Sequence, residues 1–237
     1  MIEIPESGDA SHRMWQELIR LGEDPPAPWT LIGAHMVALH GWAKGREQIR
    51  PSRDADVLVN ARAVADGTAK LSQTLVDRGY TLDGVSPDGV GHRFVREGVI
   101  IDVLGPDGMG ERANLETLGG AHTVRVPGGT QALRRSEPAE VRTRSTSGFI
   151  PLPDILGAIL VKVRAIAVDD EPQVQRRDTA FLLSLVEDPD ALVEDLTPTE
   201  RGWLRRHPYL ADPTSQPYAG LANAEDAAIV YRRLARV

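Results

Sequence analysis

Residues 50–57 read Arg50-Pro51-Ser52-Arg53-Asp54-Ala55-Asp56-Val57, and this stretch decides the expected fold. It places two carboxylates one residue apart on an apparent strand. Because alternate side chains of a strand point to the same face of a sheet, Asp54 and Asp56 should project together. The stretch therefore predicts a pair of carboxylates on one face of a sheet.

A third carboxylate, Asp102, interrupts the short apolar run of residues 99–104, which is typical of a buried strand. An unpaired ionised carboxylate in such a strand is costly, so Asp102 needs a partner. Three converging acids repel one another unless a cation lies between them, and their hard oxygen ligands suit Mg²⁺. The alternative for Asp102 is an ion pair with Arg93 or Arg96, across a hairpin that alternation and a Glu-Gly turn predict over residues 91–104.

Upstream, residues 29–35 predict a strand, a turn of two small residues and the start of a helix. Backbone amides at Gly33 and Ala34, near the helix N-terminus, are suited to a triphosphate, and glycine permits its close approach. Three polar residues next to the acid pair are expected to hold phosphate oxygens: Arg50, Ser52 and Arg53. A small-residue turn, an Asp pair and a lone Asp on a neighbouring strand follow the order of parts in a nucleotidyltransferase. Such an enzyme uses two Mg²⁺ ions during turnover to neutralise charge and align the reacting oxygens.

The rest of the chain predicts an α+β fold. Helical spacing is found over residues 11–21, with Ser11 as a plausible N-cap, and over residues 61–79; short strands are expected near residues 124–129 and 140–144. Asp154 can cap a helix that runs to about residue 168, and further helices follow. We expect a nucleotidyltransferase-fold domain with a mixed β-sheet flanked by helices over residues 1–150, and a helical domain over residues 151–237. The acids of residues 187–200, Glu200 included, are expected to lie in a solvated loop and a helix start.

These motifs resemble the AbiEii-type (MenT-like) bacterial nucleotidyltransferases, a group that includes toxins of toxin–antitoxin systems. The resemblance covers most of residues 29–185, through short motifs at residues 31–34, 38–41, 50–56, 93, 101–104, 129–133, 161–165 and 177–178. It implies the nucleotidyltransferase fold, an NTP donor and Mg²⁺. It also implies a functional lysine and aspartate, which map onto Lys162 and Asp178.

Taken from the residues alone, these two positions leave alternatives open. Lys162 lies on or beside an apolar helix face, where it either extends to solvent or faces a polar cavity that holds a phosphate. Asp178 either orients Lys162 or pairs with Arg176 or Arg177 on the surface. His35 and His40, on the helix after the small-residue turn, are expected to be packed or half-exposed.

Composition sets the broad class. The chain has 237 residues, of which 41% are hydrophobic and 26% charged, as in ordinary globular proteins. It contains no cysteine, which excludes disulfides, thiolate zinc sites and a cysteine nucleophile. The sequence shows no signal peptide and no apolar stretch of the roughly 20 residues that span a bilayer, so we expect a cytoplasmic protein without membrane contacts.

The acceptor is the least specified part of the prediction. Eight arginines are candidates for tracking an RNA backbone: Arg46, Arg50, Arg53, Arg125, Arg134, Arg135, Arg142 and Arg144. The net charge of −7 and the 5% aromatic content argue against a general nucleic-acid-coating protein, and such arginines also occur on solvated sheet faces. The leading hypothesis is NMP transfer from an NTP to the 3′ end of tRNA, in a toxin-like setting with a cognate antitoxin protein. The alternatives are an aminoglycoside-type small-molecule acceptor and a non-catalytic NTP-binding module.

Overall fold

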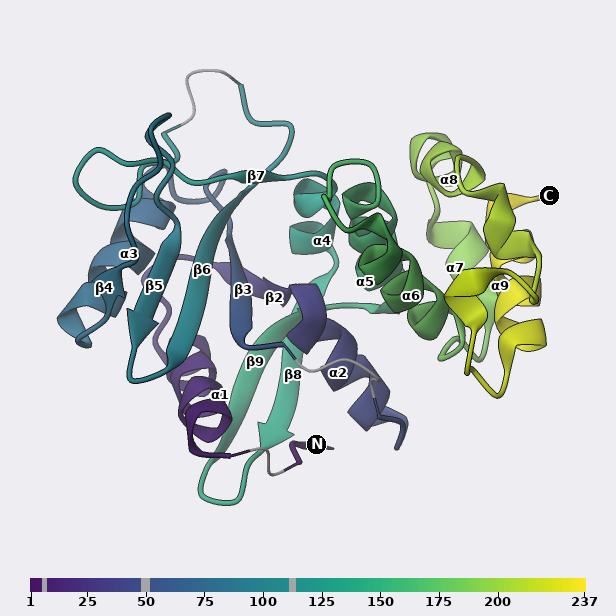
Figure 1. Cartoon of the computed structure of the whole chain (residues 1–237), viewed down its shortest axis with the longest axis horizontal. Coiled ribbons are helices and arrows are strands. Elements are labelled where there is room, and N and C mark those ends of the chain that lie inside the picture. Colours follow the sequence, from purple (N-terminus) through teal and green to yellow (C-terminus); the bar gives the residue numbers. More distant parts are fainter. Residues whose placement is uncertain (6–7, 48–51, 111–113) are drawn as a thin grey trace.

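The computed structural model describes residues 1–5, 8–47, 52–110 and 114–237. Its strands are β1 (Ile2–Glu3), β2 (Trp29–Ile32), β3 (Asp54–Val59), β4 (Thr81–Leu82), β5 (Arg93–Arg96), β6 (Val99–Pro106), β7 (Arg125–Val126), β8 (Ser136–Arg142) and β9 (Ser147–Pro153). Its helices are α1 (Asp9–Glu23), α2 (Gly33–Ala43), α3 (Gly67–Asp77), α4 (Gly129–Arg134), α5 (Ile155–Ala165), α6 (Pro172–Leu183), α7 (Pro189–Asp195), α8 (Pro198–Arg205) and α9 (Ala224–Ala235), with short 3₁₀ turns at Pro208–Ala211 and Gln216–Tyr218. Figure 1 shows the strands on one side of the molecule and helices α5–α9 on the other.

The larger sheet has the strand order β2-β3-β6-β5-β4, with β7 also paired to β6. Strands β3 and β6 are parallel, whereas β2 and β5 run antiparallel to their neighbours, so the sheet is mixed. A smaller sheet of order β1-β8-β9 packs against α1. The α+β fold with a mixed β-sheet flanked by helices was predicted from the sequence and is confirmed.

The register of the larger sheet aligns the residues of interest in one row. Asp56 on β3 lies opposite Asp102 on β6, and Asp102 lies opposite Arg93 on β5. Side chains of directly paired residues project to the same face and are close neighbours. The hairpin that sets this register turns at Glu97 and Gly98, both with positive φ, as two-residue hairpin turns require.

The helices after β9 pack onto the strand-containing part through a shared core. Leu31 and Val57 of the larger sheet belong to the same cluster of buried apolar side chains as Ile159, Leu204 and Tyr231 of the later helices. Strand β9 spans residue 150, where we expect the domain boundary, and it pairs along its whole length with β8. The division into two domains at that residue stays a prediction. In the part of the chain that the structure describes, no helix has both the length and the apolar character needed to cross a membrane.

Several elements differ from the expectations. Helix α1 begins at Asp9 with Gly8 as N-cap, so Ser11 lies inside the helix, and α3 begins only at Gly67. Strand β9 was not predicted, because Pro151 and Pro153 argue against a strand; they are tolerated because β9 lies at an edge of its sheet. Asp154 does cap α5, where its Oδ1 accepts a hydrogen bond from the Gly157 amide at 2.6 Å.

His40 connects α2 to β9 and should make stability pH-dependent. Its Nε2 lies 2.9 Å from the Pro153 carbonyl, and burial lowers its pKa to about 4. Because the unfolded state binds this proton near pH 6.5, the contribution of neutral His40 is complete above pH 6.5 and is lost as the pH falls towards 4. We expect His40→Gln to remove this loss, which amounts to no more than about 3 kcal/mol. Urea unfolding of the wild-type protein and of His40→Gln at pH 8, 6 and 4.5 measures this loss, and the difference at pH 8 gives the effect of the changed packing alone. The same change in unfolding free energy with pH in both proteins would contradict the prediction.

Candidate active site

Two of the three predicted carboxylates share one guanidinium. Arg93 donates from Nε to Asp102 Oδ1 at 2.9 Å and from Nη2 to Asp102 Oδ2 at 2.7 Å. The same Nη2 lies 3.0 Å from Asp54 Oδ2. The pKa of Arg93 is raised, chiefly by its hydrogen bonds to Asp102. The ion pair between Asp102 and Arg93, predicted as an alternative to a metal, is therefore present, and it draws Asp54 into the same cluster.

Asp56 lies between this cluster and the start of α2. Burial, together with the charges of Asp102 and Asp54, raises its pKa to about 7, although Lys162 and Arg93 act in the opposite direction. Three carboxylates thus converge while Arg93 supplies one charge beside them. Burial is the largest cause of the raised pKa of Asp56, and repulsion by the two neighbouring carboxylates comes next; a bound cation would relieve that repulsion.

The first turn of α2 directly follows β2 and faces Asp56. Gly33 has φ 72°, and a Cβ at this position would stand 1.8 Å from Asp56 Oδ2, so only glycine fits without displacing the carboxylate. No side chain caps the N-terminus of this 11-residue helix. The amides of its first turn, at Gly33 and Ala34, are therefore not used by a side-chain cap, as a phosphate-binding role requires.

The loop before β3 contributes to the environment of Asp54. Ser52 donates its hydroxyl proton to Asp54 Oδ1 at 2.6 Å, whereas Arg53 is exposed. Partial burial raises the pKa of Asp54, but the hydrogen bonds from Ser52 and from backbone, with the charges of Arg93 and His35, outweigh it, so the net shift is downwards. Arg50, also predicted to hold phosphate, lies outside the described residues.

Lys162 and Asp178 form a buried ion pair. Lys162 Nζ is 2.8 Å from Asp178 Oδ2 and donates to Gln175 Oε1 at 3.0 Å, and both charged residues are 4% exposed. Gln175 in turn donates to Asp169 Oδ2 at 2.6 Å. Lys162 therefore does not extend to solvent, and Asp178 holds the lysine. Since the charge of Lys162 lowers the pKa of Asp56, this pair belongs to the neighbourhood of the carboxylates.

The carboxylates fit Mg²⁺ by their chemistry. Among the described residues, no three His, Cys, Asp or Glu side chains form a group that could hold a metal ion as placed, and Arg93 is the cation at Asp54 and Asp102. The donor set consists of carboxylate oxygens, which are the ligands that Mg²⁺ prefers. Besides burial, the charges of Asp102 and Asp54 still raise the pKa of Asp56, so Arg93 does not cancel their repulsion. Mg²⁺ ligation by Asp54, Asp56 and Asp102 remains a prediction, with which the type of their ligand atoms agrees.

The arginines expected to track RNA mostly have partners within the protein. Arg46 bonds to Ser184 O and Asn223 Oδ1, Arg125 to Met109 O, Arg142 to Glu3, and Arg144 lies 3.8 Å from Asp9. Arg135 pairs with Glu200 at 2.9 Å, and Arg134 is 3.9 Å from the same carboxylate. Glu200 is 2% exposed, so the expectation that it is solvated is wrong; it caps α8 and neutralises Arg135.

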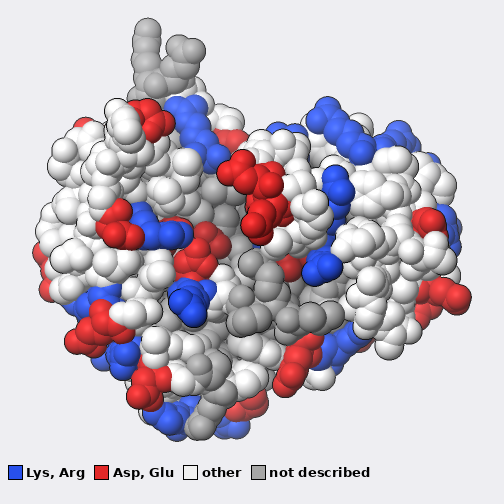
Figure 2. Space-filling model, in the orientation of Figure 1, with Lys and Arg blue, Asp and Glu red and all other residues white. Residues whose placement is uncertain are grey.

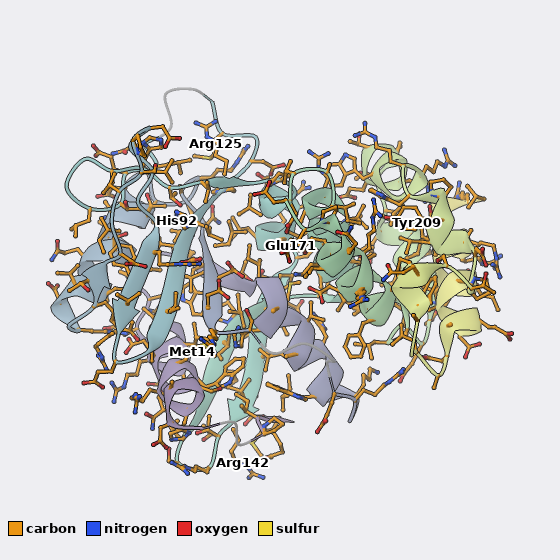
Figure 3. The ribbon with its side chains drawn as sticks, viewed as in Figure 1. Met14, His92, Arg125, Arg142, Glu171 and Tyr209 are labelled. Carbon is orange, nitrogen blue, oxygen red and sulfur yellow. The ribbon has the colours of Figure 1, made fainter. Side chains whose placement is uncertain are left out.

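The surface beside the site carries acidic side chains. Figure 2 shows a group of acids near the centre of this face, and Figure 3 labels one of them, Glu171, between the strands and the last helices. Asp169, Asp170 and Glu171 follow α5 and precede α6, and Asp169 reaches Lys162 through Gln175. The sequence analysis missed Gln175 and these acids, because they form no motif of their own.

Comparison with solved structures supports the nucleotidyltransferase-like fold that the sequence predicts. The chain is similar to an antigenic nucleotidyltransferase-like protein from Paracoccidioides brasiliensis, with a TM-score of 0.53. The similarity covers 94% of this chain and 95% of that protein at 14% sequence identity. No family model matches the sequence, and no curated protein is significantly similar to it. The chain therefore has a nucleotidyltransferase-like fold, whereas membership of the AbiEii-type group stays a prediction.

Gly33→Ala should destabilise the protein through Asp56. The added Cβ would clash with the Asp56 carboxylate, and alanine is also strained at the positive φ of this position. We therefore expect a loss of about 2–4 kcal/mol in the free energy of unfolding. Gly45→Ala is the matched control, since Gly45 has φ 64° and no described atom lies within 4 Å of its added Cβ; its loss should be about 1 kcal/mol. Introducing Asp56→Ala should restore most of the difference in a double-mutant cycle. Equal losses at Gly33 and Gly45 would contradict the contact.

Asp56→Asn should stabilise the metal-free protein at high pH. A carboxyl whose native pKa is raised binds its proton more tightly in the folded state, so its contribution to stability falls as the pH rises from about 4 through 7. Asparagine keeps the shape and removes the charge. In the presence of EDTA, we expect the gain in unfolding free energy to be larger at pH 8 than at pH 5, as measured by urea denaturation. Exposed Asp226→Asn on α9 serves as control, and a gain independent of pH would show that the native pKa of Asp56 is not raised.

Proposed function

We propose that this protein is a Mg²⁺-dependent nucleotidyltransferase that moves NMP from an NTP to an acceptor hydroxyl. The observation that carries the proposal is the convergence of Asp54, Asp56 and Asp102 beside the uncapped N-terminus of α2. The nucleotidyltransferase-like fold agrees with it. Excess negative charge next to unused backbone amides suits a cation on one side and phosphate on the other.

Each part of the site then has a role. Asp54, Asp56 and Asp102 would hold Mg²⁺, which supplies charge neutralisation at the phosphates and lowers the pKa of the acceptor hydroxyl. The amides of Gly33 and Ala34 bind phosphate oxygens, with Ser52 and Arg53 at the rim. Arg93 keeps Asp102 and Asp54 oriented. Asp178 and Gln175 fix the ammonium of Lys162, whose charge adds to phosphate binding in the buried neighbourhood of Asp56.

The first acceptor we propose is the 3′ end of tRNA. It follows from the resemblance to AbiEii-type enzymes, which also suggests a toxin-like role in the cytoplasm and an antitoxin partner. The acceptor end alone needs to reach the carboxylates, so this proposal does not require the paired arginines to form a continuous track.

A specific observation favours a second acceptor class. The acids that follow α5, together with the three site carboxylates, make the approach to the site negative, and most arginines considered for RNA are engaged elsewhere. A negative approach attracts cations. A small cationic molecule with a free hydroxyl, such as an aminoglycoside, is the acceptor with that chemistry.

The test is incubation of the protein with Mg²⁺ and each labelled NTP, first with total tRNA and then with an aminoglycoside panel. We expect label on one acceptor class, and a loss of at least 10³-fold in rate for Asp56→Asn. Asp226→Asn, an exposed change on α9, should retain full rate. Transfer that persists in Asp56→Asn would overturn the role of the carboxylates. NTP binding without transfer to any acceptor would support the non-catalytic alternative.

A further inference from the structure

A cavity of about 610 Å³ lies next to the carboxylate cluster, and the roles above leave it without an occupant. It is enclosed by α1, α2, the hairpin turn at Gly98 and the residues just before β3. Three of its lining residues belong to the site already described. Ala34 is in the first turn of α2, Ser52 donates a hydrogen bond to Asp54, and Arg53 directly precedes Asp54 in the chain. The cavity is therefore continuous with the place where phosphate is expected.

Small residues create the space in this cavity. Ala34 and Ala38 lie one helical turn apart on α2, Ala10 faces them from α1, and Gly98 closes one side. Ala38 is buried, so its methyl group is part of the wall. Larger side chains at these positions would fill the volume, and the helices already pack through other residues.

Aromatic rings of α1 and α2 line the cavity beside these small residues. Trp15 is 1% exposed and makes edge contacts with His35, at 5.1 Å between ring centroids, and with Trp42, at 5.7 Å. Met14, which Figure 3 labels on α1, adds a polarizable side chain to the same lining. Trp15 is almost fully buried, so the partly exposed ring of Trp42, held against Trp15, is the rigid, apolar surface suited to a flat ring. The polar residues of the lining are Ser11, His35, Glu47, Ser52 and Arg53, of which exposed Glu47 could meet the polar edge of a ligand.

Arg53 and Ser52 line the end of the cavity next to Asp54, whereas the part formed by α1 and α2 is mainly apolar and fits a nucleobase. A charged group would lose its hydration in an apolar cavity, whereas a base is planar, stacks on aromatic side chains and keeps its polar edge available. The volume lies within the range of ligand pockets that hold molecules of nucleoside size. Because Ala34 is shared by the cavity and the predicted phosphate cradle, a molecule bound at both places must carry a base and phosphates together.

We propose that the cavity between α1 and α2 receives the base of the NTP donor. This inference rests on the proposed function, since it takes the phosphates to lie at the N-terminus of α2. Base selection then depends on residues of α1 and α2, outside the carboxylate cluster. The experiment below distinguishes the base of the NTP from the alternative occupant, the terminal base of an RNA acceptor.

The test compares NTP binding with tripolyphosphate binding, both with Mg²⁺, by isothermal titration calorimetry. Ala38→Leu fills the cavity without touching a proposed ligand of phosphate or metal. We expect it to weaken NTP binding by at least tenfold and to leave tripolyphosphate binding unchanged. Ala191→Leu, at an exposed position of α7, is the matched control and should change neither. An unchanged NTP affinity in folded Ala38→Leu, including the case in which only the KM for an RNA acceptor rises, would overturn the proposal.

A measurement on the unaltered protein covers the case in which Ala38→Leu does not fold. We expect the indole N–H resonances of Trp15 and Trp42 to shift on addition of NTP but not of tripolyphosphate, while those of Trp29 and Trp203 stay in place. Shifts that are the same for both ligands would count against a base in the cavity. If neither ligand binds, the proposed function itself fails. If both ligands bind but the signals of Trp15 and Trp42 do not move, only the base site is wrong.

Discussion

The in-register placement of Asp56, Asp102 and Arg93 across three strands is the constraint on which the rest of the site depends. Carboxylates this close can be buried only if positive charge accompanies them. Arg93 supplies part of that charge, and its bidentate bond fixes Asp102 in orientation while it holds Asp54. The pKa of Asp56 stays raised, first by burial and then by the charges of Asp102 and Asp54. The sheet thus orients three carboxylates whose mutual repulsion is only partly neutralised.

The later helices complete this arrangement from the other side. Lys162 on α5 and Asp178 on α6 pair where both are almost fully buried, so their desolvation offsets much of their attraction. A buried ion pair is therefore weak evidence of a purely stabilising role. Its second anchor, Gln175, fixes the lysine in one position near Asp56. A preorganised cation at that place is what binding of a polyanionic substrate needs.

The sequence predicted the parts of the site whose chemistry is local. Strand β2, the Asp pair on β3, the hairpin and the Asp154 cap each depend on neighbouring residues, and all were found where expected. Contacts between distant segments were not predictable in the same way. Glu200 looked solvated because its partner, Arg135, lies 65 residues away, and β9 was concealed by prolines that only an edge strand tolerates. The choice of Arg93 over Arg96 for Asp102 depended on the register of the hairpin, which one sequence does not specify.

Helix α2 links the two binding sites proposed here, which differ in physical character. Its first turn, at Gly33, lies against Asp56, where charge and backbone amides would govern phosphate binding. One turn further, Ala38 lines the cavity, where shape and stacking would govern binding of a base. His40, on the same helix, is tied to β9 through Pro153, which fixes how α2 is oriented over the sheet. A rotation of α2 that improved one of these sites would disturb the other. Substitutions of the small residues at positions 33, 34 and 38 would therefore affect one another, because the proposed phosphate approach and the cavity volume both depend on the position of α2.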